Sequence, residues 1–420
     1  MEEKAGKNVL IVGDSAIEYS LAHKLSLLGE VQEVFVAPGN DAMREFATTV
    51  DIREDNIEEL LEFALENDID LTIVSSEKAI KADIASYFQQ NGQMIFAPTA
   101  SSAHVSISKA AGRKFMYKNR MPCPRFAIFD RPNLAMDYAK NCRMPIVIKT
   151  DEHQGPSGIM VCPSLSIAQS CIDELFDNCE KRIIIEDFVL GHEFSFYVIT
   201  DGYHSIPLGT AATYKYALDG NGGLVTSGQG AFVPDYKISR QVEKKILQQI
   251  IYPTLNSMAR NQTPYVGILG VDCVMTYDDQ LFALEFNSFL QAPECQGILD
   301  LLDENLYELI NACVVGSFAD DYDKIDIEDS YAVSCVLSSG KKQGSVIHGL
   351  GDLDETTKVG HFNTKKNSSK EYETKGGRTL VITKKAKTLS RAIGNLYDEV
   401  SLIKFDGKKY RKDIGKHVRI

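Results

Sequence analysis

The chain has 420 residues, 44% of them apolar and 9% aromatic, and a net charge of −13 at pH 7. A chain of this length exceeds a single core, so we expect about two to four domains of ordinary globular composition. The acidic balance argues against a broad nucleic-acid footprint or an acidic membrane surface as partner. Local lysines, arginines and backbone N–H groups can still hold a phosphate-bearing small molecule.

Cysteine usage and the N-terminus both indicate the cytoplasm. The nine cysteines are an odd number without a CxxC pair, which favours free thiols in a reducing compartment. Residues 1–7 are charged and lead directly into a strand, so we expect no signal peptide. No apolar run approaches the length of a membrane span. We therefore predict a cytoplasmic monomer or homodimer with neither a membrane nor a nucleic-acid partner.

The N-terminal part alternates short apolar strands with helical patterns. Strands are predicted at 8–13, 34–37 and 71–74, and helices after the first strand and at 57–66. This alternation predicts a doubly wound parallel sheet whose ligands bind at the carboxyl ends of its strands. The turn Gly13-Asp14-Ser15 lacks the GxGxxG spacing of dinucleotide-binding domains. The segment 95–98 closes this domain near residue 105.

The middle of the chain begins with a helix and linker at 108–126. The elements that we expect next are strands at 145–149 and 159–162 joined by a Gly/Pro/Ser loop at 153–158, a helix at 167–179, strands at 182–186, 193–200 and 205–209, a Gly-rich segment at 219–230 and a long helix at 238–261. A helix near 304–319 and the polar segment 320–329 precede the last domain. There we expect short strands, a helix near 389–400 and a mobile polar surface loop at 363–373.

Two apolar runs, at 266–275 and 280–286, flank the turn composition Thr276-Tyr277-Asp278-Asp279 and predict a pair of strands. Asp272 lies in the first strand, and Glu285 and Asn287 point to one face of the second because the strand period is two. Oxygen ligands without His or Cys suit Mg²⁺, which binds through a carboxylate or two plus substrate phosphates. A solvated strand face is the alternative, but the apolar neighbours argue for burial, and a buried carboxylate needs a partner. The hairpin therefore predicts a magnesium–nucleotide site.

The order of motifs resembles that of the ATP-grasp ligases and, among them, the phosphoribosylamine–glycine ligase family. The motifs span nearly the whole chain: Val36-Ala37-Pro38-Gly39-Asn40, Ser108-Lys109, Val147-Ile148-Lys149, Ile185-Glu186-Asp187-Phe188, Ile250-Ile251-Tyr252-Pro253-Thr254, Glu285-Phe286-Asn287, Gly376-Gly377-Arg378 and Tyr410-Arg411-Lys412-Asp413-Ile414-Gly415. The resemblance implies an ATP-grasp fold of the α/β class, α+β in parts. Its implied parts are a Rossmann-like substrate domain at 1–105 with a doubly wound parallel sheet, a linker and small nucleotide-lid subdomain at 106–190, a large subdomain with the metal site at 191–325, and a small C-terminal α+β domain at 326–420.

The resemblance implies ATP and Mg²⁺ or Mn²⁺ as cofactors. Lys109 and Lys149 match the lysines that neutralise the phosphates, as point charges suited to a polyphosphate. Glu285 and Asn287 match the metal ligands, and Asp272 stands where many ATP-grasp enzymes have a third acidic ligand. Each lysine alone is equally well explained as a surface residue, but the order and spacing of the whole set favour a binding function.

The remaining nucleotide contacts come from the segment 186–193. Glu186 starts the strand against which adenine packs, and the backbone of Asp187 and Val189 is expected to contact the adenine edge. Glu193 matches the carboxylate that binds the ribose.

The sequence departs from the family where its substrates would bind. The family's Gly-Gly-Arg-Glu-His turn is Ser15-Ala16-Ile17-Glu18-Tyr19, its lid lysine is Ser157, and its Arg after the metal-binding Asn is Phe289. Arg pairs with a carboxylate or phosphate through two hydrogen bonds, and Phe cannot. The candidate substrate contacts are Gly13, Ser15, Glu18, His153, Lys215, Thr226 and Phe289. For His153, simple solvation in its loop is the alternative.

These observations predict an ATP-dependent ligase that joins a carboxylate to an amine through an acyl phosphate, with changed small-molecule substrates. Whether phosphoribosylamine and glycine are still used stays open, because other residues could hold the same ligands. Such chemistry needs positioning and charge neutralisation rather than a protein nucleophile, so we assign no catalytic Ser or Cys. The alternative is a nucleotide-binding sensor or scaffold without turnover. Loss of the lid lysine favours it, and the retained metal-type residues oppose it.

Overall fold

The computed structural model describes residues 6–151 and 158–416. The N-terminal part is a five-stranded parallel sheet with the order β3-β2-β1-β4-β5. Its strands are β1 (Lys7–Gly13), β2 (Val31–Pro38), β3 (Thr48–Thr49), β4 (Leu71–Val74) and β5 (Ile95–Phe96). Alternate residues of β1 pack into different cores, Val9 and Ile11 on one face and Leu10 and Val12 on the other. The predicted doubly wound parallel sheet is thus confirmed, with both faces buried.

Helices cover this sheet and lead out of it. They are α1 (Ala16–Ser26), α2 (Ile57–Glu66), α3 (Glu77–Lys81), α4 (Ile84–Gln90), α5 (Ala100–Ile107) and α6 (Lys109–Lys118). The strand order reverses between β1 and β4, so the carboxyl ends of these two strands form a switch point.

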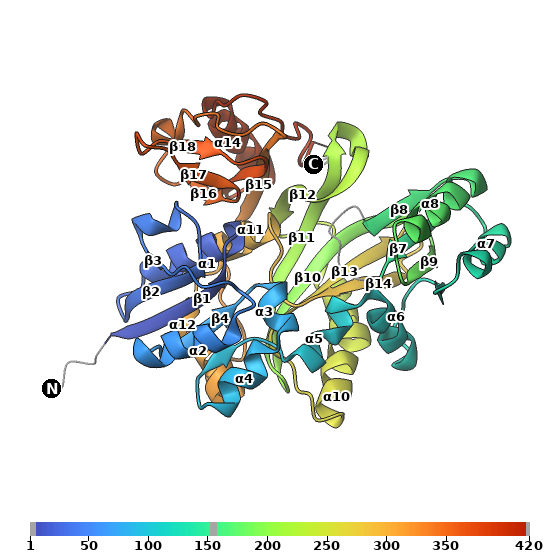
Figure 1. The fold of residues 1–420 in the computed structure, drawn as a ribbon, viewed down its shortest axis with the longest axis horizontal. Helices are drawn as coiled ribbons and strands as arrows, with labels where there is room; N and C mark the ends of the chain where they lie inside the picture. The colour runs from blue at the N-terminus through green and yellow to red at the C-terminus, as the bar shows by residue number, and fades with distance from the viewer. Residues whose placement is uncertain (1–5, 152–157, 417–420) are drawn as a thin grey trace.

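A four-stranded antiparallel sheet with the order β6-β9-β7-β8 forms the small subdomain at the opposite end of the molecule (Figure 1). Its elements are β6 (Phe126–Phe129), α7 (Pro132–Lys140), β7 (Ile146–Thr150), β8 (Ile159–Cys162), α8 (Leu165–Asp177) and β9 (Ile183–Asp187). Helices α7 and α8 pack on one face of the sheet, which leaves its other face toward the rest of the chain.

The central sheet has eight strands in the order β14-β13-β10-β11-β12-β15-β19-β16 and continues without a break into the C-terminal part (Figure 1). Its strands are β10 (Gly191–Asp201), β11 (Ser205–Leu218), β12 (Gly222–Val233), β13 (Val266–Thr276), β14 (Leu281–Asn287), β15 (Tyr331–Gly340), β16 (Lys358–His361) and β19 (Gly377–Ala386). The Gly-rich segment 219–230 is therefore mostly strand. Pairing of β12 with β11 and β15 on its two sides outweighs the low strand propensity of glycine.

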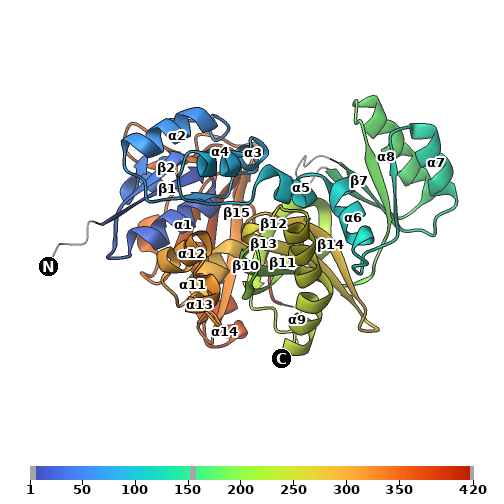
Figure 2. The same cartoon turned by 90° about the horizontal axis from the view of Figure 1, so that it is seen from below.

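The long helix predicted at 238–261 is divided into α9 (Arg240–Ile246), a π-helical turn at Leu247–Ile251 and α10 (Tyr252–Arg260). Pro253 is the second residue of α10, just after the turn, and its missing N–H breaks the regular hydrogen-bond pattern. The helix packs through Ile246, Ile250 and Leu255 against the core below β10 and β13 (Figure 2).

In the last third, one helix was missed and one expectation was wrong. Sequence analysis missed α11 (Glu294–Leu301), which is buried nearly all round and so has no amphipathic pattern. The tract 363–373, expected as a loop, contains a hairpin of β17 (Thr364–Lys366) and β18 (Tyr372–Thr374). The other helices are α12 (Leu306–Val315), α13 (Phe318–Asp321) and α14 (Leu389–Leu402). In the described ranges, no helix combines the length and apolarity needed to cross a membrane.

Candidate active site

A cleft lies between the four-stranded sheet and the central sheet. Its apolar walls come from β7 and β8 on one side, with Val147 and Val161, and from the β13–β14 hairpin on the other, with Val274 and Leu284. Of the predicted nucleotide contacts, those that line this cleft are Lys149, Glu186, Asp187, Val189 and Glu193. Apolar walls with a few converging polar groups are typical of a small-molecule site.

Glu186 holds two cations beside this cleft. Its carboxylate accepts hydrogen bonds from Nε and Nη2 of Arg113, at 2.5 and 2.6 Å, and lies 3.1 Å from Nζ of Lys149. Burial alone would raise the pKa of Glu186, but the charges of Lys149 and Arg113 outweigh it and hold the pKa below its usual value. Burial lowers the pKa of Lys149, against the opposing charge of Glu186. Glu186 therefore fixes the position of Lys149 at the cleft.

The next residues on this strand differ in what they can offer a base. The N–H of Asp187 donates to the carbonyl of Arg125 at 2.9 Å, and its carboxylate pairs with the Arg125 guanidinium. The N–H of Asp187 is thus already used, so of the two predicted backbone N–H groups the one of Val189 remains to donate to a ring nitrogen of adenine. Glu193 is exposed on β10, beside Val274 in the ladder.

Lys109 opens helix α6 and points to the metal-type hairpin. Asp151 fixes the start of the helix, because its carboxylate accepts from the Ser108 hydroxyl at 2.7 Å and from the N–H of Ala110 at 2.9 Å. Lys109 Nζ then lies 3.5 Å from Oε2 of Glu285. Lys109, Glu285 and Asn287 line one pocket. Glu285 also lines the cleft between the four-stranded sheet and the central sheet, so the pocket and the cleft are adjacent.

The hairpin brings Asp272, Glu285 and Asn287 together on one sheet face. Asp272 stands opposite Glu285, and Asn287 is one strand period further on. Asp272 is 6% exposed and is already held by three donors: the Ser195 hydroxyl at 2.9 Å, Nδ2 of Asn287 at 3.2 Å and Nζ of Lys215 at 2.5 Å. Burial alone would lower the pKa of Lys215. The negative charges of Asp272, Glu285 and Glu193 outweigh burial and raise the pKa.

This donor set fits Mg²⁺ better than a metal that needs a protein cage. Over residues 6–151 and 158–416, no group of three or more His, Cys, Asp or Glu side chains is close enough to hold an ion. One carboxylate and one amide oxygen, from Glu285 and Asn287, suit an ion that keeps waters and takes other ligands from phosphates. If Asp272 also held the ion, its carboxylate would have to bind both the ion and Lys215.

Sequence analysis missed one buried acid behind the hairpin, Glu294 at the start of α11. It is 3% exposed, lies 3.0 Å from the Ser195 hydroxyl and accepts from the hydroxyls of Tyr197 and Thr213. Burial raises the pKa of Glu294 to about 7, and the negative charge of Asp272 adds to the effect. Ser195 thus connects Glu294 to Asp272. Sequence reasoning missed Arg113 too, although its i, i+4 spacing from Lys109 on one helix face was a usable signal.

The predicted substrate contacts of the N-terminal part, Gly13, Ser15 and Glu18, lie against one another. Ser15 caps α1, and the Glu18 carboxylate accepts from the N–H and hydroxyl of Ser15 at 2.8 and 2.6 Å and from the Ser75 hydroxyl at 2.6 Å. Gly13 has φ +142°, and a Cβ there would lie 2.4 Å from Oε1 of Glu18. Burial raises the pKa of Glu18. These residues shape the end of β1 through their own contacts.

Two further candidates differ in how much can be said of them. The Thr226 hydroxyl donates to the carbonyl of Lys215 at 2.8 Å and accepts from the N–H of Gly228 at 3.2 Å, so it fixes the backbone next to Lys215. His153 and Ser157 lie outside the described residues.

Comparison with known proteins places these features in a family. Models of the phosphoribosylglycinamide synthetase N domain, ATP-grasp (A) domain and C domain match residues 7–106, 107–295 and 338–417. A phosphoribosylamine–glycine ligase from Halalkalibacterium halodurans is 32% identical over 97% of this chain and 96% of its own length. The chain belongs to the phosphoribosylamine–glycine ligase family. It is a family of ATP-dependent ligases that form a C–N bond, and its members use ATP and Mg²⁺.

Solved structures confirm the ATP-grasp fold. The phosphoribosylamine–glycine ligase of Thermotoga maritima superposes with a TM-score of 0.82 at 23% identity, over 97% of this chain and all of that one. The biotin carboxylase domain of the Hydrogenobacter thermophilus 2-oxoglutarate carboxylase, solved with MgADP, has a TM-score of 0.73 at 15% identity and covers 96% of this chain and 91% of its own.

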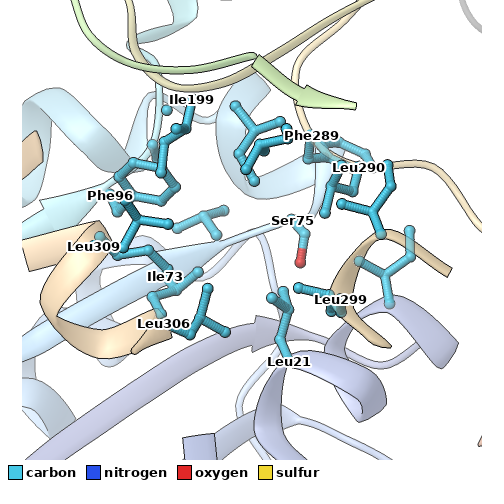
Figure 3. A pocket seen from close by; sticks show the side chains of 18 of the residues that line it. Leu21, Ile73, Ser75, Phe96, Ile199, Phe289, Leu290, Leu299, Leu306 and Leu309 are labelled. Atoms are coloured by element: carbon cyan, nitrogen blue, oxygen red, sulfur yellow. The ribbon is translucent and has the colours of Figure 1, made fainter. Parts of the chain in front are cut away.

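Two departures from the family pattern meet in space. Ile17 and Phe289, both at positions where the resemblance places Arg, line one cavity of about 30 Å³ between the N-terminal sheet and the central sheet (Figure 3). Its lining contains no charged side chain, and the hydroxyl of Ser75 donates to Glu18. Phe289 also lines the pocket of Lys109 and Glu285. The apolar cavity therefore adjoins the metal-type hairpin.

Proposed function

We propose that this chain is an ATP-dependent ligase that joins a carboxylate to an amine through an acyl phosphate. The observation that carries the proposal is the position of Glu285, which lines the apolar cleft together with Lys149 and lines the adjoining pocket, where its Oε2 lies 3.5 Å from Nζ of Lys109. Lys109 of α6 and Lys149 of β7 thus flank a carboxylate of the central sheet, which is the charge pattern that a metal–polyphosphate needs.

In this proposal the cleft holds adenine between Val147 and Val161 on one wall and Val274 and Leu284 on the other. Lys109 and Lys149 offset the charge of the phosphates. Glu285 and Asn287 would hold Mg²⁺, which when bound draws negative charge from the phosphates and makes the γ-phosphorus more electrophilic.

The chemistry then needs positioning more than a protein nucleophile. A carboxylate oxygen of the substrate attacks the γ-phosphorus, the bond to the β-phosphate oxygen breaks, and ADP leaves. The amine nitrogen next attacks the acyl carbon, phosphate leaves, and the nitrogen loses a proton to give the amide. Lys215, held on Asp272 beside Glu285, is placed to stabilise the negative charge that develops on the acyl oxygen.

We further propose that the substrates differ from those after which the family is named. The cavity that Ile17 and Phe289 line offers no charged group, so it cannot compensate a phosphate or a bare carboxylate. Loss of two charge-assisted hydrogen bonds, at roughly 1.5–3 kcal/mol each, weakens binding by about a hundredfold or more. A less anionic or more apolar substrate should be preferred. A cytoplasmic location and a monomeric or homodimeric state are part of the same proposal.

A panel of carboxylates and amines tests this function. ADP and phosphate release would be measured for each pair, with mass spectrometry of the product. We expect release that requires both substrates and yields an amide, and poor turnover with phosphoribosylamine and glycine. Nucleotide binding without release for any pair would instead support a sensor or scaffold. Efficient formation of glycinamide ribonucleotide would refute the changed specificity.

A further inference from the structure

Arg378 is a partly exposed cation that has no acidic partner among the residues that the structure describes. It is the second residue of β19 and follows the two glycines Gly376 and Gly377, and its Nη1 donates to the carbonyls of Ser227 at 3.2 Å and Ala292 at 3.1 Å. Its Cζ lies 4.3 Å from the ring centroid of Phe362. In the described chain it makes no ion pair. Burial alone lowers the pKa of Arg378 to about 10, because no negative charge opposes the loss of water.

The two fully buried arginines of the described residues, Arg113 and Arg411, pair with carboxylates in a way that Arg378 does not. Arg113 uses the edge formed by Nε and Nη2 to hold both oxygens of Glu186, at 2.5 and 2.6 Å. Arg411 holds both oxygens of Asp413 through the same edge, at 2.7 and 2.5 Å. Arg378 has Phe362 on its ring face and carbonyls at Nη1. Within the residues described, its Nε–Nη2 edge has no hydrogen-bond acceptor.

Other arginines without an ion pair differ from Arg378 because solvent screens them. Among residues 6–151 and 158–416 they are Arg120, Arg143, Arg240, Arg260 and Arg391, and all are exposed. Arg378 is instead placed where the C-terminal part meets the central sheet and the segment before α11. A cation in such surroundings needs an anion, and a planar edge of two N–H donors matches a carboxylate or a phosphate.

The location connects Arg378 to the candidate active site. Ser227, whose carbonyl Arg378 contacts, follows Thr226, which is bound to Lys215. Ala292, its other contact, lies between Phe289 and Glu294. The guanidinium thus stands beside two segments that carry candidate substrate contacts, and it does not line the apolar cavity of Ile17.

We infer that the Nε–Nη2 edge of Arg378 binds an oxyanion of a substrate, a carboxylate or a phosphate. This rests on the proposed function only for the statement that the ligand is a substrate. The preferred substrate class therefore carries an acidic group, which pairs with the free edge of Arg378.

Anion-dependent thermal stabilisation of the full chain tests the inference. Inorganic phosphate and acetate are the probes, and Mg²⁺ with a non-hydrolysable ATP analogue fills the nucleotide site so that neither probe is measured there. The unfolding midpoint rises with anion concentration when only the folded state binds. We expect saturable stabilisation by at least one probe. Response to phosphate alone assigns a phosphoryl group, and response to acetate alone assigns a carboxylate.

Three variants test whether the anion binds at Arg378. Arg378→Met should weaken the anion affinity by at least about tenfold, and Arg378→Lys should also weaken it because Lys lacks the planar edge. Arg391→Met, at an exposed arginine without an ion pair, should leave the affinity within about twofold. Turnover is not needed for any of these measurements, so failure of the ligase proposal would leave them unchanged.

A structural clamp between domains would give a different pattern. It predicts that Arg378→Met lowers the midpoint without anion and keeps the anion-dependent rise. The anion site predicts an unchanged or higher midpoint without anion and loss of the rise, because an uncompensated charge is removed. Absence of saturable stabilisation by either probe, or equal affinities for the parent and Arg378→Met, would overturn the inference.

Discussion

Replacing Glu186 with glutamine should destabilise the fold more than any exposed ion pair could. The side chains of Arg113, Glu186 and Lys149 are 2%, 2% and 7% exposed, so solvent barely screens the two cations once the carboxylate is gone. Leaving a buried charge without its partner costs about 3–5 kcal/mol, and here two cations, Arg113 and Lys149, lose the same carboxylate. We expect a loss in the upper part of that range, read from the urea midpoint and slope by circular dichroism.

The same cluster predicts a pH dependence. Because the folded pKa of Glu186 is lowered, its contribution to stability is present above the unfolded value of about 4.3 and is lost as pH falls through the folded pKa. Below about pH 4.3, the parent should therefore lose stability more steeply than Glu186→Gln. The variant should also bind an ATP analogue more weakly, since Lys149 loses its anchor.

Asp187→Asn on the same strand is the matched control. It breaks a pair with Arg125 whose side chains are 40% and 66% exposed, and such a pair contributes at most about 1 kcal/mol. Equal losses for Glu186→Gln and Asp187→Asn would refute the view that the buried cluster organises the nucleotide end.

Other substitutions test the remaining parts of the account. Glu285→Ala should abolish ADP release and weaken Mg²⁺-dependent nucleotide binding, measured by titration with and without the metal; near-normal activity would remove Glu285 from the metal site. Glu294→Gln should flatten the pH dependence of the unfolding midpoint, because a raised pKa contributes stability below about pH 4.3 that is lost as pH rises through about 7. A parallel fall in both proteins would contradict the assignment of this titration to Glu294. Gly13→Ala should lower the melting temperature, since its Cβ meets the Glu18 carboxylate at positive φ; an unchanged melting temperature would show that the turn can adapt.

Local signals were enough for several elements of the fold. Helix α2 matches its prediction because Asn56 caps it and Leu60, Leu61 and Ala64 form its buried stripe. Strand β4 also matches, as a short apolar run bounded by polar residues. The pairing of β13 with β14 follows from turn composition and strand period, but Asp272 stands opposite Glu285 because of a register shift between Asp272 and Cys273, which no local signal shows.

The rest depended on contacts between distant segments. Nothing local shows that Glu186 meets Arg113, 73 positions away, rather than the nucleotide. The cavity shared by Ile17 and Phe289 arises only when the N-terminal sheet packs on the central sheet. The free edge of Arg378 is equally a product of tertiary packing, since the sequence gives the motif Gly376-Gly377-Arg378 without its surroundings.

Transfer of oxygen from the carboxylate substrate to phosphate tests the central claim most directly. With a carboxylate labelled with ¹⁸O, an acyl phosphate that reacts with the amine releases phosphate carrying one labelled oxygen, read by mass spectrometry. The account predicts this transfer, with ADP and amide formed in equal amounts. Release of unlabelled phosphate, or of ADP without any carboxylate, would contradict the proposal that this chain activates a carboxylate for ligation.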